Sequence, residues 1–595
     1  MSRTRKLERF PNLVAMFFTR AREGGDTPFL WRKQDGAWVA ISWADAARQV
    51  ASLAAGLRAI GLDRGDRVML VAENRPEWCL SDLAIMAAGC VTVPTYVTNT
   101  TRDHSHIIEN SGARAVIVST EKLARALMPA VLRASHAQIV IGMEEMRVAR
   151  SGVAYHDWHA LVAAHPADPT AAEAAADFAR QDLACLIYTS GTGGSPRGVR
   201  QHHGAILHNV EGTSAAIAED IGWGSGDKGE VFLSFLPLSH AYEHSAGQFL
   251  SIGLGAQTYY AEGLERLAGN IEEVRPTIMV VVPRLFEVLR TRIVKGIEKG
   301  GGIAAALLAR AVAIEARRVD GRLRLADRPA ALAVALLLRP RVRARFGGRL
   351  KAMISGGAPL APAVGDFFSA IGLLVLQGYG QTEAGPIISC NRPRAGIAMD
   401  TVGPPLGVIE VRIAQDGEIL VRGENVMHGY WRADEESARV LAGGWLHTGD
   451  VGEIDAAGRI RITDRKKDII VNDKGENVAP QKVEGMLTLQ PEIGQAMIAG
   501  DRRPHMVAVI VPDAEWASEW RAAHPAGTDD ERRAAVSAAV DRVNRDLSAA
   551  EKVRRFILAD EPFGIENGQM TPSLKIRRHV LRERYGERLD KLYRA

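Results

Sequence analysis

A segment rich in glycine and hydroxyl residues has the composition of a phosphate-binding loop. It reads YTSGTGGSPRGV from Tyr188 to Val199 and directly follows an apolar run at 184–188. Glycines let the backbone turn tightly, while backbone N–H groups and hydroxyls can form a nest for anions. A guanidinium adds a fixed positive charge that suits phosphate. We therefore expect the loop to bind a triphosphate through Thr189, Ser190, Gly191, Thr192, Gly194 and Arg197.

This loop is not a Walker loop, because no Gly-Lys-Ser/Thr follows at the required spacing. A P-loop ATPase of the motor type is excluded for the same reason. The other interpretation is an ordinary surface loop rich in glycine and serine. The density of hydroxyls and glycines directly after a buried strand favours a binding function.

Two further apolar strands end in small or polar residues. LKAMISGGAPL (350–360) runs into a flat slot that an adenine ring could enter, made by Gly356, Gly357, Ala358 and Pro359. QGYGQTEAG (377–385) supplies Gly378, Tyr379, Gly380, Gln381, Thr382 and Glu383. Ligands of open α/β sheets bind beyond the carboxyl ends of strands, so Tyr379 could stack on a base and Glu383 could bind Mg²⁺. Taken singly, the first segment is also typical of a strand-to-helix turn, and Glu383 of a solvated carboxylate.

Three polar segments lie further downstream. GWLHTGD (444–450) ends in Asp450, which could accept hydrogen bonds from both ribose hydroxyls or could be a turn aspartate. The charged run 464–468 separates two differently built regions, so it could be a hinge rather than only a solvated linker. Lys575 lies in TPSLKIRR, and from these residues alone it reads as a solvated side chain.

Length and composition restrict the class of protein. A chain of 595 residues exceeds the roughly 250–300 residues that one core supports, so at least two lobes are expected. The balance of 74 basic against 70 acidic residues gives no reason to expect a nucleic-acid partner. The four cysteines form no CxxC pair, which fits a reducing cytoplasm. No apolar run reaches the ~18 residues of a membrane-spanning helix, and no secretion signal is expected.

The first two-thirds of the chain alternates apolar runs with helical patterns, such as 44–60 and 285–299. This predicts an α/β fold with largely parallel sheets and helices. The expected strands are Arg67–Val71, Ala115–Ser119, Ile139–Ile141, Ala184–Tyr188, Val231–Phe235, Ile278–Val282, Lys351–Ile354 and Leu373–Leu376. A polar, Ala-rich stretch at 165–180 reads as a linker.

The last third has hairpin turns at 416–417, 455–458 and 472–475, then strands at 493–498 and 506–511 and an amphipathic helix at 531–547. A small α+β C-terminal domain is therefore expected. We place an N-terminal domain at 1–463 and a mobile C-terminal domain at 464–595, with a hinge at 464–468.

An Ala/Leu/Arg-rich insert at about 293–348 has two interpretations. It could be a helical hairpin packed on the core, or a basic amphipathic element that touches a membrane surface. The expected location is therefore the cytoplasm, with peripheral contact at the inner membrane face as an open alternative. The oligomeric state is also open, and a homodimer is one option.

The order of these motifs resembles the adenylate-forming superfamily of acyl-CoA synthetases, luciferases and peptide-synthetase adenylation domains. The resemblance runs from NRPE (74–77) to Arg578 and includes FLPLSHAYEH, GWLHTGD and DRKKDIIVNDKGENVAP. The helical insert resembles the long-chain fatty acyl-CoA synthetase branch. Two departures lie in the phosphate loop, where Gly193 replaces a usual threonine and Arg197 a usual lysine.

The resemblance implies that ATP, Mg²⁺ and coenzyme A are used to activate a long-chain fatty acid to acyl-AMP, with release of pyrophosphate, and to transfer it to coenzyme A. It assigns Mg²⁺ to Thr192 and Glu383, and catalysis to Lys575. Adenine would contact Gly356 to Pro359 and Tyr379, while Asp450 and Arg465 would hold the ribose. Asp464 would be the hinge, and His240 would lie near the acyl group unless it is structural. In the second step, the domain would rotate and Gly475 would let the pantetheine arm pass.

Three alternatives stay open. The acyl-adenylate could be passed to a carrier-protein thiol instead of coenzyme A. An aryl or amino acid could be the substrate, although the insert disfavours this. A nucleotide-binding module without turnover is favoured only by Gly193 and Arg197. The joint presence of Glu383, Asp450, Arg465 and Lys575 argues against it.

Overall fold

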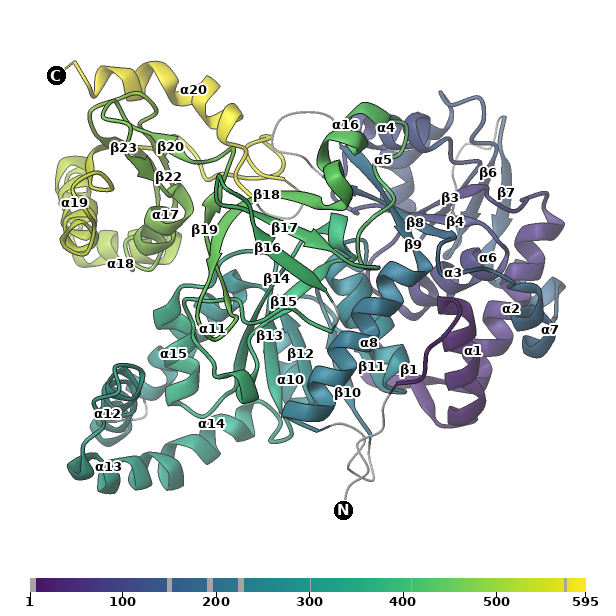
Figure 1. Ribbon diagram of the computed structural model, residues 1–595, viewed down its shortest axis with the longest axis horizontal. Helices are drawn as coiled ribbons and strands as arrows, with labels where there is room; N and C mark the ends of the chain where they lie inside the picture. Colours follow the sequence, from purple (N-terminus) through teal and green to yellow (C-terminus); the bar gives the residue numbers. More distant parts are fainter. Residues whose placement is uncertain are drawn as a thin grey trace.

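The computed structural model describes residues 7–146, 152–189, 196–222, 229–299, 301–407, 409–571 and 575–594. Two large sheets dominate the N-terminal region, as Figure 1 shows. In spatial order, the eight-stranded sheet consists of β15 (Ile387–Cys390), β14 (Val375–Gly380), β13 (Ala352–Ser355), β12 (Ile278–Val281), β10 (Val231–Ser234), β11 (Gln257–Tyr260), β1 (Pro28–Gln34) and β2 (Ala37–Ser42). The seven-stranded sheet consists of β7 (Ala154–Asp157), β6 (Ile139–Gly142), β5 (Ala115–Val118), β3 (Arg67–Val71), β4 (Val91–Pro94), β8 (Leu183–Thr189) and β9 (Arg197–His202).

Most neighbouring strands of both sheets are parallel, as predicted, with antiparallel pairs such as β14–β15 and β8–β9 at the edges. The predicted strands are present, and β3 has the predicted bounds. The largest difference is at β14, which was expected at 373–376. It extends to Gly380 because its glycine-containing end pairs with β15.

Helices fill the space between the sheets and cover their outer faces. The main hydrophobic core joins alternate side chains of β3, such as Val68 and Leu70, to α1, α2 and α3, while Met69 and Val71 face a second core with α4 and α5. Strands buried on both faces explain the continuous apolar runs. The helices of this region are α1 (Leu13–Gly24), α2 (Trp43–Ala59), α3 (Pro76–Ala87), α4 (Thr101–Ser111), α5 (Glu121–Val131), α6 (Trp158–Ala164), α7 (Pro169–Ala175), α8 (His203–Asp220), η1 (Glu243–Phe249), α9 (Leu250–Gly253) and α10 (Leu267–Val274).

The segment expected to be a linker at 165–180 contains helix α7, so that prediction was wrong in part. Asp168 caps this helix by accepting a hydrogen bond from the Thr170 N–H (3.2 Å), and Pro169 occupies its first turn. A capping carboxylate followed by proline starts a helix even in a short, polar segment.

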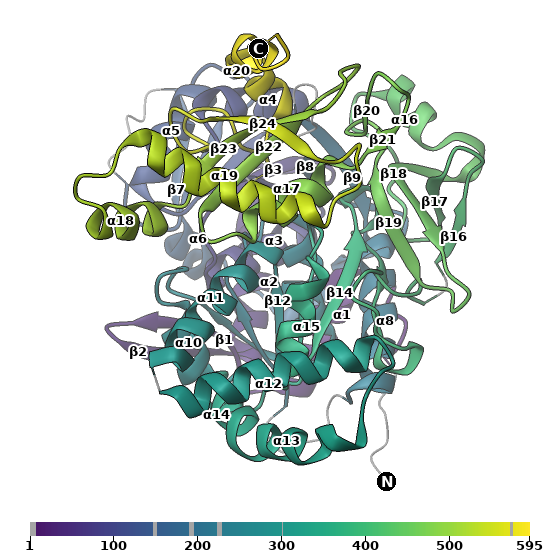
Figure 2. The ribbon, with the colours of Figure 1, turned by 90° about the vertical axis from the view of Figure 1, so that its left-hand side faces the viewer.

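The insert is helical, as expected, and its inner face packs on the outer side of the eight-stranded sheet. Leu308, Val334 and Leu338 join the core there with Met279 and Met353. Its elements, with the two flanking helices, are α11 (Pro283–Lys299), α12 (Gly302–Val319), η2 (Leu325–Asp327), α13 (Arg328–Ala333), η3 (Val334–Leu338), α14 (Arg339–Arg345) and α15 (Pro362–Ala370). Figure 2 places α12 and α13 at one edge of the molecule, away from the C-terminal helices.

A four-stranded antiparallel sheet leads from the two large sheets toward the C-terminal region. Its strands, with the adjoining helix, are β16 (Glu410–Ile413), β17 (Glu418–Arg422), β18 (Leu446–Ile454), β19 (Ile460–Arg465) and α16 (Asp434–Val440). The predicted turns at 416–417 and 455–458 connect β16 to β17 and β18 to β19.

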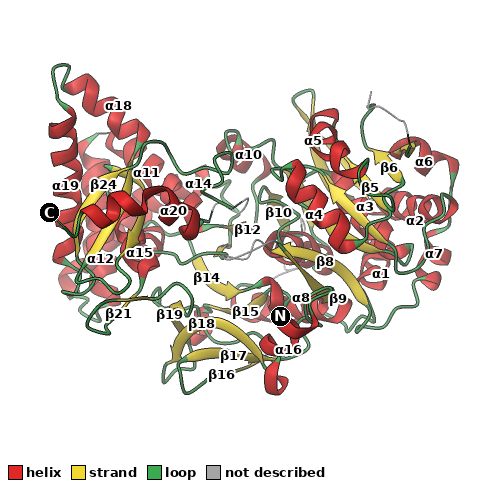
Figure 3. Ribbon diagram, turned by 90° about the horizontal axis from the view of Figure 1, so that it is seen from above, coloured by secondary structure: helices red, strands yellow, loops and turns green. Residues whose placement is uncertain are grey.

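The C-terminal region has its own cores, one of which is built around Val483, Ile510 and Val540. In Figure 3 it lies at the opposite end of the molecule from β5 and β6. Its elements are β20 (Ile470–Val471), β21 (Asn477–Val478), α17 (Pro480–Thr488), β22 (Ile493–Ala499), β23 (Met506–Pro512), α18 (Ala514–Ala523), α19 (Asp529–Arg545), β24 (Val553–Leu558) and α20 (Arg578–Lys591). The exact division near Asp464 stays a prediction.

Candidate functional site

The expected phosphate loop joins two paired strands. Thr189 ends β8 and lies opposite Arg197, which begins β9. The loop residues between them that we expected to bind phosphate, namely Ser190, Gly191, Thr192 and Gly194, lie outside the described residues. Their predicted roles therefore stay predictions. The surroundings of the loop are described from Thr189 and Arg197, the residues at its two ends.

The Arg197 side chain connects this loop to Glu383. Its guanidinium pairs with the carboxylate of Glu436 and lies 4.8 Å from the centre of the Tyr430 ring. The Tyr430 hydroxyl donates a hydrogen bond to Oε1 of Glu383 (2.8 Å). The Gln201 amide of β9 donates to the carbonyl oxygen of Thr382, the residue before Glu383. The expected phosphate ligand and the expected metal ligand are thus neighbours.

The small residues at 356–359 follow β13 and lie beside the end of β14. A Cβ at Gly356 would lie 2.7 Å from the ring of Tyr242, and Gly357 has φ +83°. The Tyr242 hydroxyl donates to the carbonyl oxygen of Ile354 (2.9 Å). Ala358 and Pro359 are exposed. Because Gly356 has no side chain, Tyr242 can pack against the backbone there. The exposed side of the turn stays open to a flat ligand.

Glycines in β14 are required by the strand beside it. A Cβ at Gly380 would lie 2.0 Å from the carbonyl oxygen of Pro386, and one at Gly378 would lie 3.3 Å from that of Ser389. The Gln381 N–H donates to the same Pro386 oxygen (2.9 Å). These contacts fix the backbone that carries Tyr379 and Glu383.

Asp450 contacts two other predicted site residues, Tyr379 and Arg465. Its Oδ2 accepts a hydrogen bond from the Tyr379 hydroxyl (2.7 Å), and its Oδ1 accepts one from Nε of Arg465 (3.0 Å). Asp450 on β18 and Arg465 on β19 are direct cross-strand partners. Each carboxylate oxygen has further lone pairs, so Asp450 could still accept bonds from ribose hydroxyls. Tyr379 is buried and uses its hydroxyl on Asp450; its stacking on a base stays a prediction.

Lys575 comes from the C-terminal region and lies among these N-terminal groups. The Lys575 N–H donates to Oγ1 of Thr571 (3.0 Å), and the Thr571 N–H donates to the carbonyl oxygen of Lys575 (2.8 Å). The Lys575 side chain keeps an exposed surface, but the protein around its ammonium group partly desolvates it. This loss of bulk water, together with the cation of Arg465, lowers the pKa of Lys575 to about 8, against the opposing effect of Asp450 and Glu383.

His240 lies near Lys575 on the N-terminal side. Burial, and then the positive charge of Lys575, lower the pKa of His240 to about 4, so the imidazole is neutral at pH 7. Its Nδ1 accepts a hydrogen bond from the Tyr242 N–H (3.1 Å), and its ring centre lies 6.4 Å from that of Tyr96. A neutral histidine held in this way can contact an acyl group without adding charge.

Gly475 is not brought together with this cluster. It has φ +79° in the β20–β21 turn, and its N–H donates to the carbonyl oxygen of Asn472 (3.1 Å). In the same turn the Asp473 N–H donates to the carbonyl oxygen of Arg503, also in the C-terminal region (3.2 Å). The predicted role of Gly475 in the second step therefore requires a different orientation of this region.

The hinge segment is tied to the N-terminal sheet through Lys466, whose Nζ contacts Asp416 (2.6 Å) and Glu418 (3.2 Å). On its C-terminal side, Arg578 donates to Glu484 (2.8 Å). Burial raises the pKa of Asp464 to about 6. These ion pairs hold the residues on either side of the segment, and its role as a hinge stays a prediction.

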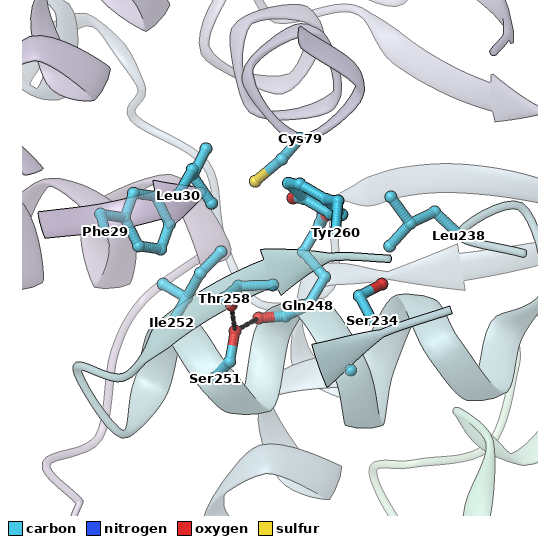
Figure 4. A pocket seen from close by; sticks show the side chains of 11 residues that line it. Phe29, Leu30, Cys79, Ser234, Leu238, Gln248, Ser251, Ile252, Thr258 and Tyr260 are labelled. Atoms are coloured by element: carbon cyan, nitrogen blue, oxygen red, sulfur yellow. Dashed lines mark hydrogen bonds between the residues drawn. The ribbon is translucent and has the colours of Figure 1, made fainter. Parts of the chain in front are cut away.

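The gap drawn in Figure 4 is a different feature from this cluster. It lies between β1, α3, β11 and η1 and is lined by residues such as Leu30, Cys79, Gln248 and Tyr260. The gap is too narrow to admit a water molecule. We therefore interpret it as imperfect packing rather than as the substrate site.

Sequence reasoning missed Tyr242, Tyr430 and Glu436. Tyr242 has a signal in hindsight, because its neighbour His240 belongs to a motif that the resemblance singled out. Tyr430 and Glu436 reach the site only through the folding of the chain, and no spacing in the sequence connects them to Glu383 or Arg197.

Comparison with known proteins identifies the family of the chain. Residues 17–431 match the model of the AMP-binding enzyme family, and residues 467–595 match that of the AMP-binding enzyme C-terminal domain. The chain therefore belongs to the AMP-binding enzymes.

Two named relatives and one solved structure are similar to the chain over most of its length. The chain is 34% identical to the long-chain-fatty-acid–CoA ligase FadD15 of Mycobacterium tuberculosis, over 98% of this chain and 97% of that protein. It is 30% identical to the peroxisomal long chain acyl-CoA synthetase 7 of Arabidopsis thaliana, over 94% and 83% of the two chains. The fold matches the A domain of a carboxylic acid reductase from Segniliparus rugosus, solved with AMP and a co-purified carboxylic acid, with a TM-score of 0.77 at 21% identity over 98% and 94% of the chains.

Proposed function

We propose that the chain activates a long-chain fatty acid with ATP, releasing pyrophosphate, and transfers the acyl group from acyl-AMP to coenzyme A. The names of its full-length relatives support the substrate class. The observation that carries the proposal is the position of Lys575, which belongs to the C-terminal region but lies within electrostatic reach of Asp450, Arg465 and Glu383.

The first step needs positive charge, because a carboxylate must approach a triphosphate. The carboxylate oxygen attacks the α-phosphorus, the new P–O bond forms, and the bond to pyrophosphate breaks. Lys575 offsets the charge between the two anions, while Arg197 and Thr189 face the leaving group. Such a step depends mainly on positioning and electrostatics. Asp450 and Tyr379 would fix the nucleoside, so that the α-phosphate is presented to the acid in line.

Mg²⁺ fits the residues around Glu383. The described residues contain no group of three or more His, Cys, Asp or Glu side chains that could hold a metal by themselves. Mg²⁺ on a nucleotide needs few protein ligands, because phosphate oxygens and waters complete its octahedron. The half-buried carboxylate of Glu383, oriented by Tyr430, would supply one oxygen, and Thr192 is the second expected ligand. When bound, the ion would offset negative charge on the triphosphate.

The second step requires a thiol, not Lys575, beside the acyl carbonyl. We propose that the C-terminal domain rotates about 464–468, which removes Lys575 and brings the Gly475 turn to the site. The coenzyme A sulfur then bonds to the carbonyl carbon and the bond to AMP breaks. Gly475 has no Cβ and no atom within 4 Å of where one would be, so this turn can let a ligand pass closely.

Product analysis tests the proposal. The purified chain is incubated with ATP, Mg²⁺ and a series of fatty acids, with either coenzyme A or an acyl carrier protein, and AMP, pyrophosphate and thioester are measured together. We expect equal amounts of AMP and acyl-CoA with long-chain acids. Thioester on the carrier protein alone would favour the carrier-protein ligase, and absence of pyrophosphate with every acid would contradict the reaction class.

A further inference from the structure

One face of the insert carries apolar side chains that lie open to solvent. Eight of the thirteen large apolar side chains that the described residues expose lie between Ile303 and Leu337. Leu325 is 75% exposed, Leu336 66% and Leu332 60%. The same helices bury Leu308 and Val334 on their inner side, so the outer apolar residues form a second face that the fold does not use. A concentration of this kind marks an interaction surface.

These side chains lie on two neighbouring segments, namely the continuous helix formed by α13 and η3, and the turn that precedes it. Leu332 and Leu336 are four residues apart in α13 and η3, so they lie on the same side of the helix. The turn between α12 and α13 exposes Leu323 and Leu325. Figures 1 and 2 show α12 and α13 at the edge of the molecule, where a flat surface could approach them.

The insert also accounts for the net positive charge of the chain. Residues 301–349 contain eleven arginines and three carboxylates, which gives a net charge of +8. The complete chain has a net charge of +4, so the remainder has a net charge of −4. Two of the three carboxylates, Glu315 and Asp327, are buried and paired with arginines of the insert. The surface that solvent meets is therefore strongly basic.

Arginines and leucines alternate where the insert is most exposed. The sequence from Arg322 to Leu325 reads RLRL, and these four side chains are exposed. Arg328, also exposed, precedes Leu332 by four residues and lies on the same side of the helix. Long basic side chains can keep their charge at a polar boundary while apolar neighbours enter a less polar layer.

We propose that the outer face of this insert docks on membranes that contain anionic phospholipids. Leu323, Leu325, Leu332 and Leu336 would enter the boundary between head groups and acyl chains, and the arginines would contact lipid phosphates. A lipid surface is the partner that offers a plane of negative charge directly above an apolar layer. Contact would be peripheral: among the described residues, no helix combines the length and apolarity that a crossing requires. This goes beyond the proposed reaction, because binding requires no turnover.

Sedimentation with vesicles tests the proposal without any substrate. The full chain is mixed with vesicles of phosphatidylcholine alone or of equal parts phosphatidylcholine and phosphatidylglycerol. We expect binding to the anionic vesicles, weaker binding at high salt, and little binding to the neutral ones. L332S/L336S should weaken binding at least about tenfold, because two buried apolar contacts are lost. R322Q/R324Q should weaken it about twenty-five-fold, from about fivefold for each charge near the surface.

A matched control separates this face from surface hydrophobicity in general. Leu264 is 61% exposed, like Leu332, but lies outside the insert, so L264S should bind like the unchanged chain. Thermal unfolding establishes that each variant is folded, and if L332S/L336S is not, R322Q/R324Q carries the test. Equal loss in L264S, or no binding to anionic vesicles by the unchanged chain, would overturn the proposal. Light scattering that shows a dimer which L332S/L336S dissociates, without vesicle binding, would instead assign the face to a second copy of the chain.

Discussion

Alkaline pH should stop adenylate formation by removing the proton of Lys575. Burial and the neighbouring Arg465 lower the pKa of Lys575 from 10.5 to about 8. At pH 7 about nine in ten of these side chains are charged, but at pH 9 only about one in ten is. If the cation is needed, kcat/KM for ATP in the first step should fall about tenfold for each pH unit above about 8.

The assay is pyrophosphate release with ATP, Mg²⁺ and fatty acid, measured from about pH 6 to about pH 10, where kcat/KM reports the free enzyme. Asp464, with a pKa of about 6, and His240, with a pKa of about 4, titrate on the acid side and do not produce this decline. Lys575→Arg keeps its charge over the range and should flatten the profile. An identical alkaline decline in Lys575→Arg, or none in the unchanged chain, would refute the reasoning.

Three further predictions concern single positions around the nucleotide site. Glu383→Gln should raise the Mg²⁺ concentration needed for half-maximal pyrophosphate release by about tenfold or more, since a charged ligand is lost; an unchanged Mg²⁺ dependence would remove Glu383 from the site. Asp450→Asn should weaken ATP binding by about tenfold to hundredfold, measured by calorimetry, because charged hydrogen bonds contribute about 1.5–3 kcal/mol; unaltered affinity would exclude ribose binding there. Gly380→Ala should lower the thermal midpoint, because the new Cβ would lie 2.0 Å from a backbone oxygen. Gly485→Ala in α17, with nothing within 4 Å, should not lower it.

The sheets could be predicted because their strands are buried on both faces. Runs such as 68–71 and 278–281 consist of apolar residues throughout, and this pattern can be recognised without tertiary information. The end of β14 could not be predicted, because two of its last three residues are glycines and their strand conformation comes from pairing with β15. Helix α7 was missed because its signal is a cap and a proline, not a periodic apolar face.

The residues of the candidate site could be predicted from the sequence better than the contacts between them. Asp450 and Arg465 are fifteen residues apart, and the hairpin between them makes them cross-strand partners, which a turn at 455–458 already indicates. Tyr379 was expected to stack on a base, which stays a prediction, and the contact of its hydroxyl with Asp450 was not foreseen. Long-range contacts of this kind follow from how two sheets meet. Composition and spacing give no information about that geometry.

The position of Lys575 is the central claim, and separating the two half-reactions tests it most directly. Lys575→Ala should slow formation of acyl-AMP from ATP and fatty acid by about a hundredfold to a thousandfold, the usual effect of losing one charge-stabilising group. Formation of acyl-CoA from supplied acyl-AMP and coenzyme A should stay close to the unchanged rate. Equal loss of both half-reactions, or full retention of the first, would contradict the account.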